Sequence, residues 1–192
     1  MNKPLFAALA AAAVAPALVL AQALPSATPA PALVLAQAPL PALAAAPVPA
    51  PAPAARGPSL KLALEAAQKA LDPCKGLDQK VGVTVVDSAG ILKVVLATDG
   101  ASTRGVASST NKALTSLAFT ASTSELGDKI KSDAALAEKV AANPNYNTHA
   151  GGLLLKVGDD VIGAIGVGGA KGSEKDEACA LAGLNKVKRR LK

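Results

Sequence analysis

The stretch GGLLLKVGDDVIGAIGVGGA, residues 151–170, decides the fold of the second half of this chain. Its two apolar runs, 153–157 and 161–167, are separated by the sequence GDD, which is typical of tight hairpin turns. The pattern therefore predicts two antiparallel strands. Gly163 and Gly166 interrupt the second run, and at such positions the missing side chain lets another element or a ligand approach the backbone closely.

A helix is predicted directly after this hairpin, because a Gly-rich loop leads into Ser173, with Asp176 three residues further on. Ser173 is predicted as the N-cap of this helix. Glu174 and Glu177 have the spacing that places two carboxylates on one helical face, where they can hold a hard cation. The preferred interpretation is simpler: acidic residues in a first turn complement the helix dipole.

The first half of the domain begins with another helix, which Ser59 is predicted to cap and which Pro73 and Gly76 are predicted to end. Two β-branched runs follow, 81–87 and 91–97, joined by a short turn that contains glycine. These runs predict a second hairpin.

Between the two hairpins the sequence predicts two or three helices. One covers 103–120, and another starts at Ser132 and Asp133 and continues through Val140. The predicted order is helix, hairpin, two or three helices, hairpin, helix. Hairpins with segregated helices indicate an α+β fold, in which a small antiparallel sheet of two hairpins is flanked by helices.

The N-terminal part of the chain has the composition of an export signal and a spacer. Residues 1–23 contain a lysine, an apolar run and an A-x-A site, which predict a cleaved signal peptide. Residues 24–58 are almost only Pro, Ala, Leu and Val, and we expect a disordered linker. The folded domain is predicted to be 59–192, periplasmic or secreted, with no membrane span after signal cleavage.

Composition limits the function classes. The formal net charge is +6, and the basic residues cluster at the C-terminus without aromatic residues to stack on bases, so we do not expect nucleic-acid binding. The chain has only three aromatic residues, Phe6, Phe119 and Tyr146. Small aliphatic side chains must then fill the core, and we expect self-association into a homo-oligomer to add buried surface.

The two cysteines, Cys74 and Cys179, form an even pair in a chain that is predicted to be exported. Paired cysteines in an oxidising compartment are usually bridged. The hypothesis is a disulfide that joins the end of the first helix to the last helix. The alternative is two free thiols.

The motifs VIGAIGVGGA (161–170) and DEACALAGL (176–184) resemble the end of the GlcG/HbpS family, whose members carry nearly the same strand, loop and helix. The hairpin 83–90 with the following DGA, and the helix around Lys112 and Thr115, are also similar to family motifs. Leu154 and Thr98 depart from the pattern, where the family usually has Pro and Met. The resemblance extends from about Leu60 to Leu184.

This resemblance implies a protein that binds haem or a related tetrapyrrole, and that handles or degrades haem. Haem iron takes an axial His, Cys, Met or Tyr. The resemblance therefore makes His149 and Tyr146 the candidate axial ligands, and we expect Lys112 and Thr115 to line the same cleft. The simpler interpretation of His149 and Tyr146 is that both are polar loop residues.

Two other functions stay open at this point. Some relatives belong to glycolate use, so the chain is alternatively an accessory protein or enzyme that acts on a small 2-hydroxy acid. A purely structural domain is the third alternative. No Ser-His-Asp set can be assembled from the sequence, and catalytic residues are left unassigned.

Overall fold

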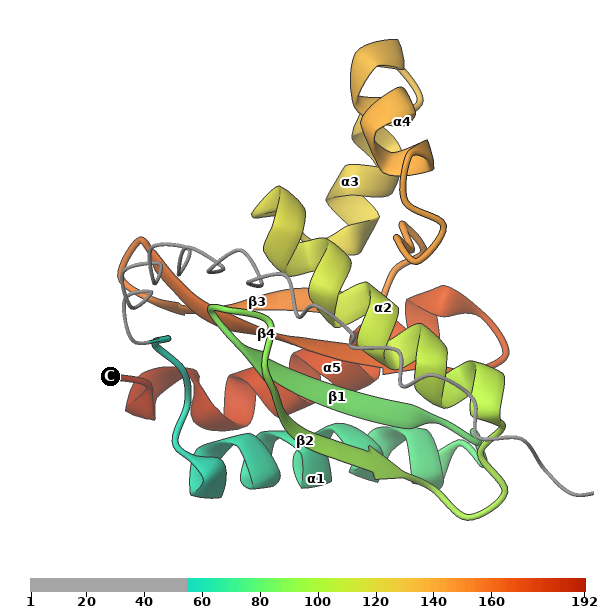
Figure 1. Cartoon of the computed structure of the whole chain (residues 1–192). Coiled ribbons are helices and arrows are strands. Elements are labelled where there is room, and N and C mark those ends of the chain that lie inside the picture. The colour runs from blue at the N-terminus through green and yellow to red at the C-terminus, as the bar shows by residue number, and fades with distance from the viewer. Residues whose placement is uncertain (1–54) are drawn as a thin grey trace, which may run out of the picture. The chain divides into compact units, whose positions relative to one another are not determined.

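The computed structural model describes residues 55–192 (Figure 1). The predicted signal peptide, 1–23, and residues 24–54 of the predicted linker lie outside the described residues. Four strands form one antiparallel sheet in the order β2-β1-β4-β3. The strands are β1 (Gly82–Asp87), β2 (Leu92–Ala97), β3 (Gly152–Val157) and β4 (Asp160–Gly168).

Both predicted hairpins are present, and the pairing of β1 with β4 joins them into one sheet. Val85 lies opposite Ile165 in this central pair, and every residue of β1 is buried. The sheet and its flanking helices confirm the α+β fold that the sequence predicts. The helices are α1 (Leu60–Gly76), α2 (Thr103–Phe119), α3 (Thr123–Lys129), α4 (Ala134–Ala141) and α5 (Ser173–Val187), followed by a short 3-10 turn, Lys188–Arg190.

The helices form two layers around the sheet (Figure 1). Helices α1 and α5 pack side by side on one face, and α2 crosses the other face over β1, β3 and β4. Helices α3 and α4 extend away from the sheet beyond the end of α2, and α4 has no buried residue. Among the described helices, none is long and apolar enough to cross a membrane.

The core between the sheet and the α1–α5 layer is built from small aliphatic side chains. Val83, Val85, Ile165 and Val167 point into it from the central strands and are fully buried. The facing side of α1 supplies mainly alanines, so the helix lies close to the sheet. Its buried residues are Ala63, Ala66, Ala67, Ala70, Leu71 and Cys74.

On the opposite face, glycines let α2 lie almost directly on the strand backbones. A Cβ atom added to Gly166 would overlap the carbonyl oxygen of Ser109, and one added to Gly152 would overlap that of Lys112. The role predicted for Gly166, close approach of another element, is therefore correct. The polar side chains caught in this contact satisfy one another, since the Oγ1 atom of Thr84 lies 2.8 Å from the Oγ atom of Ser109.

The disulfide hypothesis is confirmed. Cys74 and Cys179 are bonded, with their Cα atoms 5.9 Å apart and a separation of 105 positions in the sequence. Both side chains are almost completely buried. The bridge ties the last turn of α1 to the first half of α5.

Several helix ends differ from the sequence predictions. Pro73 lies inside the last turn of α1, which continues to Gly76, because a proline near the end removes only one backbone hydrogen bond. Ser173 is not the N-cap of α5: Gly172 occupies that position, and no side chain caps the helix. The predicted N-cap Ser59 is correct, and of the two residues predicted to start α4, Ser132 and Asp133, the second is its N-cap.

The sequence predicts two or three helices between the hairpins, and α3 brings their number to three. Its N-terminus carries a capping box, in which the Ser122 side chain accepts from the backbone N–H of Glu125 and the Glu125 side chain accepts from that of Ser122. This S-x-x-E pattern is visible in the sequence and would have located the helix.

Residues 55–58 belong to the predicted linker, yet they contact the domain. The backbone N–H of Arg56 donates to the Oγ atom of Ser88 over 2.9 Å, and its guanidinium lies 2.6 Å from the carboxylate of Asp160. Arg56 thus touches the turns of both hairpins. The expectation of disorder does not hold for these last linker residues.

The C-terminal basic cluster is partly neutralised by α1. Glu65 pairs with Arg190 at 2.7 Å and with Lys186 at 3.6 Å. The hydrogen bond from the Arg190 guanidinium, aided by the positive charge of Lys186, holds the pKa of the Glu65 carboxyl below its usual value. These contacts give part of the cluster a structural role.

Candidate functional site

A cavity of about 310 Å³ lies where three segments meet. The N-terminal half of α2 forms one wall, the loop 146–150 forms a second, and the loop from β4 into α5 forms the third. The lining residues are mainly small or polar: Ser102, Arg104, Gly105, Ser108, Lys112, Asn147, His149, Gly169, Ala170, Ser173 and Asp176.

One stripe of α2 supplies much of this lining, because residues four apart lie on the same helical face. Arg104, Ser108 and Lys112 have this spacing, and all three line the cavity. The N-terminal end of the helix is held against the β4–α5 loop, where Gly105 packs on the backbone of Gly169. The sequence predicts Lys112 as a lining residue but not Arg104 or Ser108, although their four-residue spacing is visible in it.

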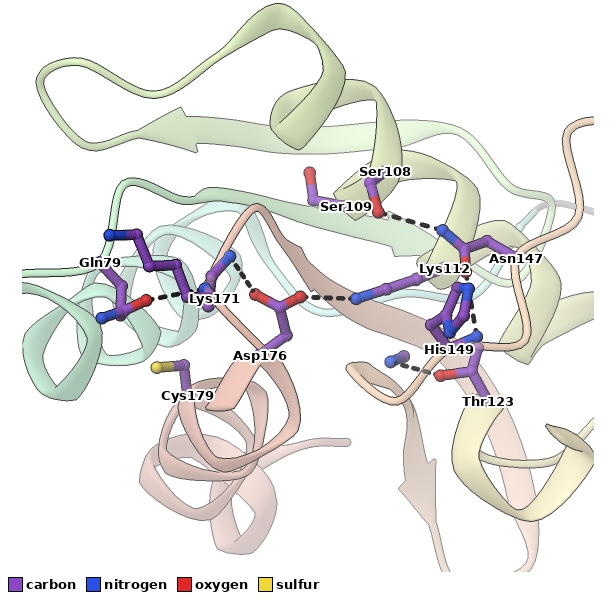
Figure 2. A network of polar contacts seen from close by, with 12 residues as sticks. Gln79, Ser108, Ser109, Lys112, Thr123, Asn147, His149, Lys171, Asp176 and Cys179 are labelled. Carbon is purple, nitrogen blue, oxygen red and sulfur yellow. Dashed lines mark hydrogen bonds and ion pairs between the residues drawn. The ribbon is translucent and has the colours of Figure 1, made fainter. Parts of the chain in front are cut away.

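Lys112 forms a buried ion pair across the bottom of the site (Figure 2). Its Nζ atom lies 2.7 Å from one carboxylate oxygen of Asp176, and the two side chains are only 2% and 4% exposed. The other oxygen of Asp176 accepts from the backbone N–H of Ala170 over 3.0 Å. Asp176 therefore links α2, α5 and the β4–α5 loop.

His149 lies on the loop between α4 and β3, and Asn147 holds that loop in place. The Asn147 side chain accepts from the backbone N–H of His149 over 3.0 Å and donates to the Oγ atom of Ser108 over 3.0 Å. The imidazole itself has no hydrogen-bond partner among residues 55–192, and His149 is exposed. Figure 2 shows its ring at the Lys112 side of this network.

Thr115 does not line the cavity, contrary to expectation, but it positions the same loop. Its hydroxyl donates to the carbonyl of Asn111 over 2.7 Å and accepts from the backbone N–H of Asn147 over 2.9 Å. Its side chain is fully buried. Thr115 thus acts on the site through Asn147.

Tyr146 does not join His149 in the cavity. Its ring packs edge-on against Phe119, with the ring centroids 5.0 Å apart and the planes at 77°. The position of the Tyr146 ring cannot be predicted from its spacing to His149. The ring packs at the end of α2, against the only other Phe, Tyr or Trp side chain in 55–192.

A second cavity of about 370 Å³ adjoins the first, and His149 and Ser173 line both. It opens between α3 and the loop that leads into β3. Its lining is also polar: Ser124, Gly127, Asp128, Lys131, Thr148, His149, Ala150 and Ser173. His149 is therefore accessible from two sides.

The two glutamates of α5 lie apart from this lining. Glu177 accepts a hydrogen bond from the hydroxyl of Ser124 over 2.8 Å, which ties α5 to α3, and Glu174 is exposed. Within the described residues, no three His, Cys, Asp or Glu side chains gather in a way that could hold a metal ion. The structure gives Glu177 a packing role.

The donor set fits the iron and the propionate groups of a haem. His149 offers an unengaged imidazole, which suits an axial ligand to iron, and Arg104 and Lys112 offer cations for propionate groups. Neither cavity has a large aliphatic or aromatic side chain in its lining. The residues present therefore fit the iron and the carboxylates of a haem better than the apolar faces of its macrocycle.

The family described as "Haem degrading protein HbpS-like" matches residues 59–185. The fold is similar to the crystal structure of HbpS, at 32% identity and a TM-score of 0.62, over 67% of this chain and 89% of that one. A double mutant of Streptomyces reticuli HbpS is similar at 32% identity and a TM-score of 0.63, over 74% of this chain and 97% of that one.

A structure described as a PduOC:heme complex shares the fold, with 23% identity and a TM-score of 0.62, over 68% of this chain and 94% of that one. A search of curated proteins found no match. The matches to HbpS cover the region that the sequence motifs indicated, and they confirm that resemblance.

Proposed function

Since this chain belongs to the HbpS-like family, we propose that it binds haem or a related tetrapyrrole beside Lys112, with the imidazole of His149 as the axial ligand. The observation that carries this proposal is the position of His149. Its side chain is exposed, has no partner in the described part of the chain, and lines both cavities.

The surrounding residues prepare the imidazole for this role. Asn147 fixes the backbone of His149, and Ser108 and Thr115 fix Asn147 in turn, so the loop is tied to α2 at two points. The ion pair of Lys112 with Asp176 holds the opposite wall. A bound haem would supply iron-centred ligand and redox chemistry, and the residues of this chain would orient it.

Hemin titration followed by absorbance tests the proposal. We expect wild-type protein to give a saturable, stoichiometric Soret shift and His149→Ala to lose it, because the substitution removes the axial nitrogen. Tyr146→Phe is the matched control, since it removes the phenol oxygen and keeps the contact with Phe119. A shift that survives in His149→Ala and disappears in Tyr146→Phe would contradict the assignment.

A small 2-hydroxy acid such as glycolate is the second candidate ligand. The size and polar lining of the first cavity favour it, because 310 Å³ lies at the lower end of the range of small-molecule sites. This alternative implies thermal stabilisation by glycolate in the absence of any Soret band.

Export of the protein to the periplasm or the medium remains part of the proposal. The disulfide between Cys74 and Cys179 supports it, since such bridges persist in oxidising compartments. The predicted signal peptide, 1–23, supports it independently.

We also propose that the domain self-associates through the edge strand β2. Ile91, Leu92 and Val95 are 60%, 53% and 41% exposed, and one edge of the strand has no backbone partner within 55–192. Such an apolar edge favours pairing with another copy. We expect Val95→Lys to lower the mass measured by light scattering, and the control Leu60→Lys on α1 to leave it unchanged. A wild-type monomer would contradict this proposal.

A further inference from the structure

The first cavity contains more positive than negative charge. Arg104 and Lys112 contribute two cations, and Asp176 is the one carboxylate among its lining residues. Both oxygens of Asp176 already accept hydrogen bonds, from Lys112 and from the backbone of Ala170. The net effect is a polar cavity that favours a ligand with a negative charge.

Arg104 has no structural role that would explain its place. It is exposed, and it forms no ion pair or side-chain hydrogen bond with any residue that the structure describes. It also lies in the first turn of α2, two residues after the N-cap Ser102. A cation there is unfavourable for the helix dipole, so the position costs free energy unless an anion binds beside it.

Lys112 adds unused donors at the bottom of the cavity. Its ammonium group has three N–H bonds, and one of them reaches Asp176. The side chain is 2% exposed, yet it belongs to the cavity lining. The remaining N–H bonds are therefore available to a ligand in a site where water is scarce, which strengthens charged hydrogen bonds.

Two serine hydroxyls are also free to donate. The Oγ atom of Ser102 accepts from the backbone N–H of Gly105, and the Oγ atom of Ser108 accepts from the Asn147 side chain. Because each oxygen accepts these bonds, its own O–H can donate to a ligand. Guanidinium, ammonium and hydroxyl donors thus surround the same space.

We propose that this cavity binds the carboxylate group of its ligand, with Arg104 as the principal contact through paired N–H donors. This inference rests on the proposed function, because it places that ligand in the same cavity. A carboxylate can come from two sources: a free small hydroxy acid, or a propionate arm of a tetrapyrrole. The two sources share the chemistry and differ in what else they require.

Two titrations of the full chain distinguish these sources. The first measures the heat of glycolate binding. The second follows the Soret band with hemin and with hemin dimethyl ester, which has no free carboxylate. Each uses wild type, Arg104→Ala and the control Arg189→Ala, which removes the same charge beyond the far end of α5.

We expect Arg104→Ala to lower the affinity for one of these ligands by about 10-fold to 100-fold, which is the effect of losing a charged hydrogen-bond pair. The affinity of Arg189→Ala should equal that of the wild-type protein. Loss of glycolate binding would assign a free acid. Weaker hemin binding with unchanged binding of the ester would assign a propionate.

The inference would be overturned if the wild-type protein bound neither glycolate nor hemin. It would also be overturned if Arg104→Ala bound glycolate and hemin with the same affinities as the wild-type protein. The inference would also be overturned if Arg104→Ala weakened the binding of hemin and of its dimethyl ester equally and the wild-type protein did not bind glycolate. Glycolate binding that depends on Arg104 without any Soret shift would refute haem binding and leave the carboxylate site standing.

Discussion

Lys112→Ala is expected to lower the free energy of unfolding by about 3–5 kcal/mol, the usual cost of removing one partner from a buried ion pair. The substitution leaves the carboxylate of Asp176 uncompensated at 4% exposure, between α2 and α5. Denaturant unfolding followed by circular dichroism measures the change. Lys112→Met keeps most of the side-chain volume and should still be strongly destabilised, because it too leaves Asp176 unpaired.

The matched control is Lys131→Ala, which breaks the exposed pair with Asp128, where the side chains are 74% and 77% exposed. We expect a change below about 1 kcal/mol for it, since water and salt screen such pairs. A loss for Lys112→Ala no larger than this would mean that the buried pair contributes little to holding the two helices.

Removal of the disulfide should have an effect of similar size. The bridge closes a loop of 105 residues, for which the chain-entropy account gives about 4–5 kcal/mol. A domain whose total stability is about 5–15 kcal/mol would become marginal. We expect the double variant Cys74→Ala/Cys179→Ala, and wild type in reductant, to unfold at clearly lower denaturant concentrations.

Reductant supplies the internal control, because it should have no further effect on the double variant. Wild-type protein that unfolds at the same denaturant concentration with and without reductant would contradict the expected contribution of the bridge. The first half of α5 carries both Cys179 and Asp176, so we also expect reduction to loosen the wall of the cavity.

The sequence predicts the elements of this fold well, because local patterns determine them. The GDD turn between two apolar runs, and the helix N-caps Ser59 and Asp133, can be recognised without tertiary information. The family resemblance likewise depends on short motifs. The pairing of β1 with β4 is not local, and the hairpin patterns alone did not indicate it.

The candidate site was predicted only in part, for the same reason. The sequence predicts Lys112 and His149 as site residues, but the partner of Lys112 lies 64 residues away and is predicted only as an acidic residue in the first turn of the last helix. Arg104 was missed because its lack of a partner becomes visible only when the surrounding side chains are placed. The packing of Tyr146 against Phe119 cannot be predicted from the sequence, because it is a tertiary contact.

Helix α4 buries none of its residues, so we expect it to open more often than the rest of this domain. A segment without buried contacts opens locally at little cost, so its amide protons should exchange with solvent while the sheet remains closed. Between α4 and His149, the chain is first held to the rest of the domain by the three hydrogen bonds of Asn147. We therefore expect protection from exchange to begin at Asn147, between α4 and the candidate site.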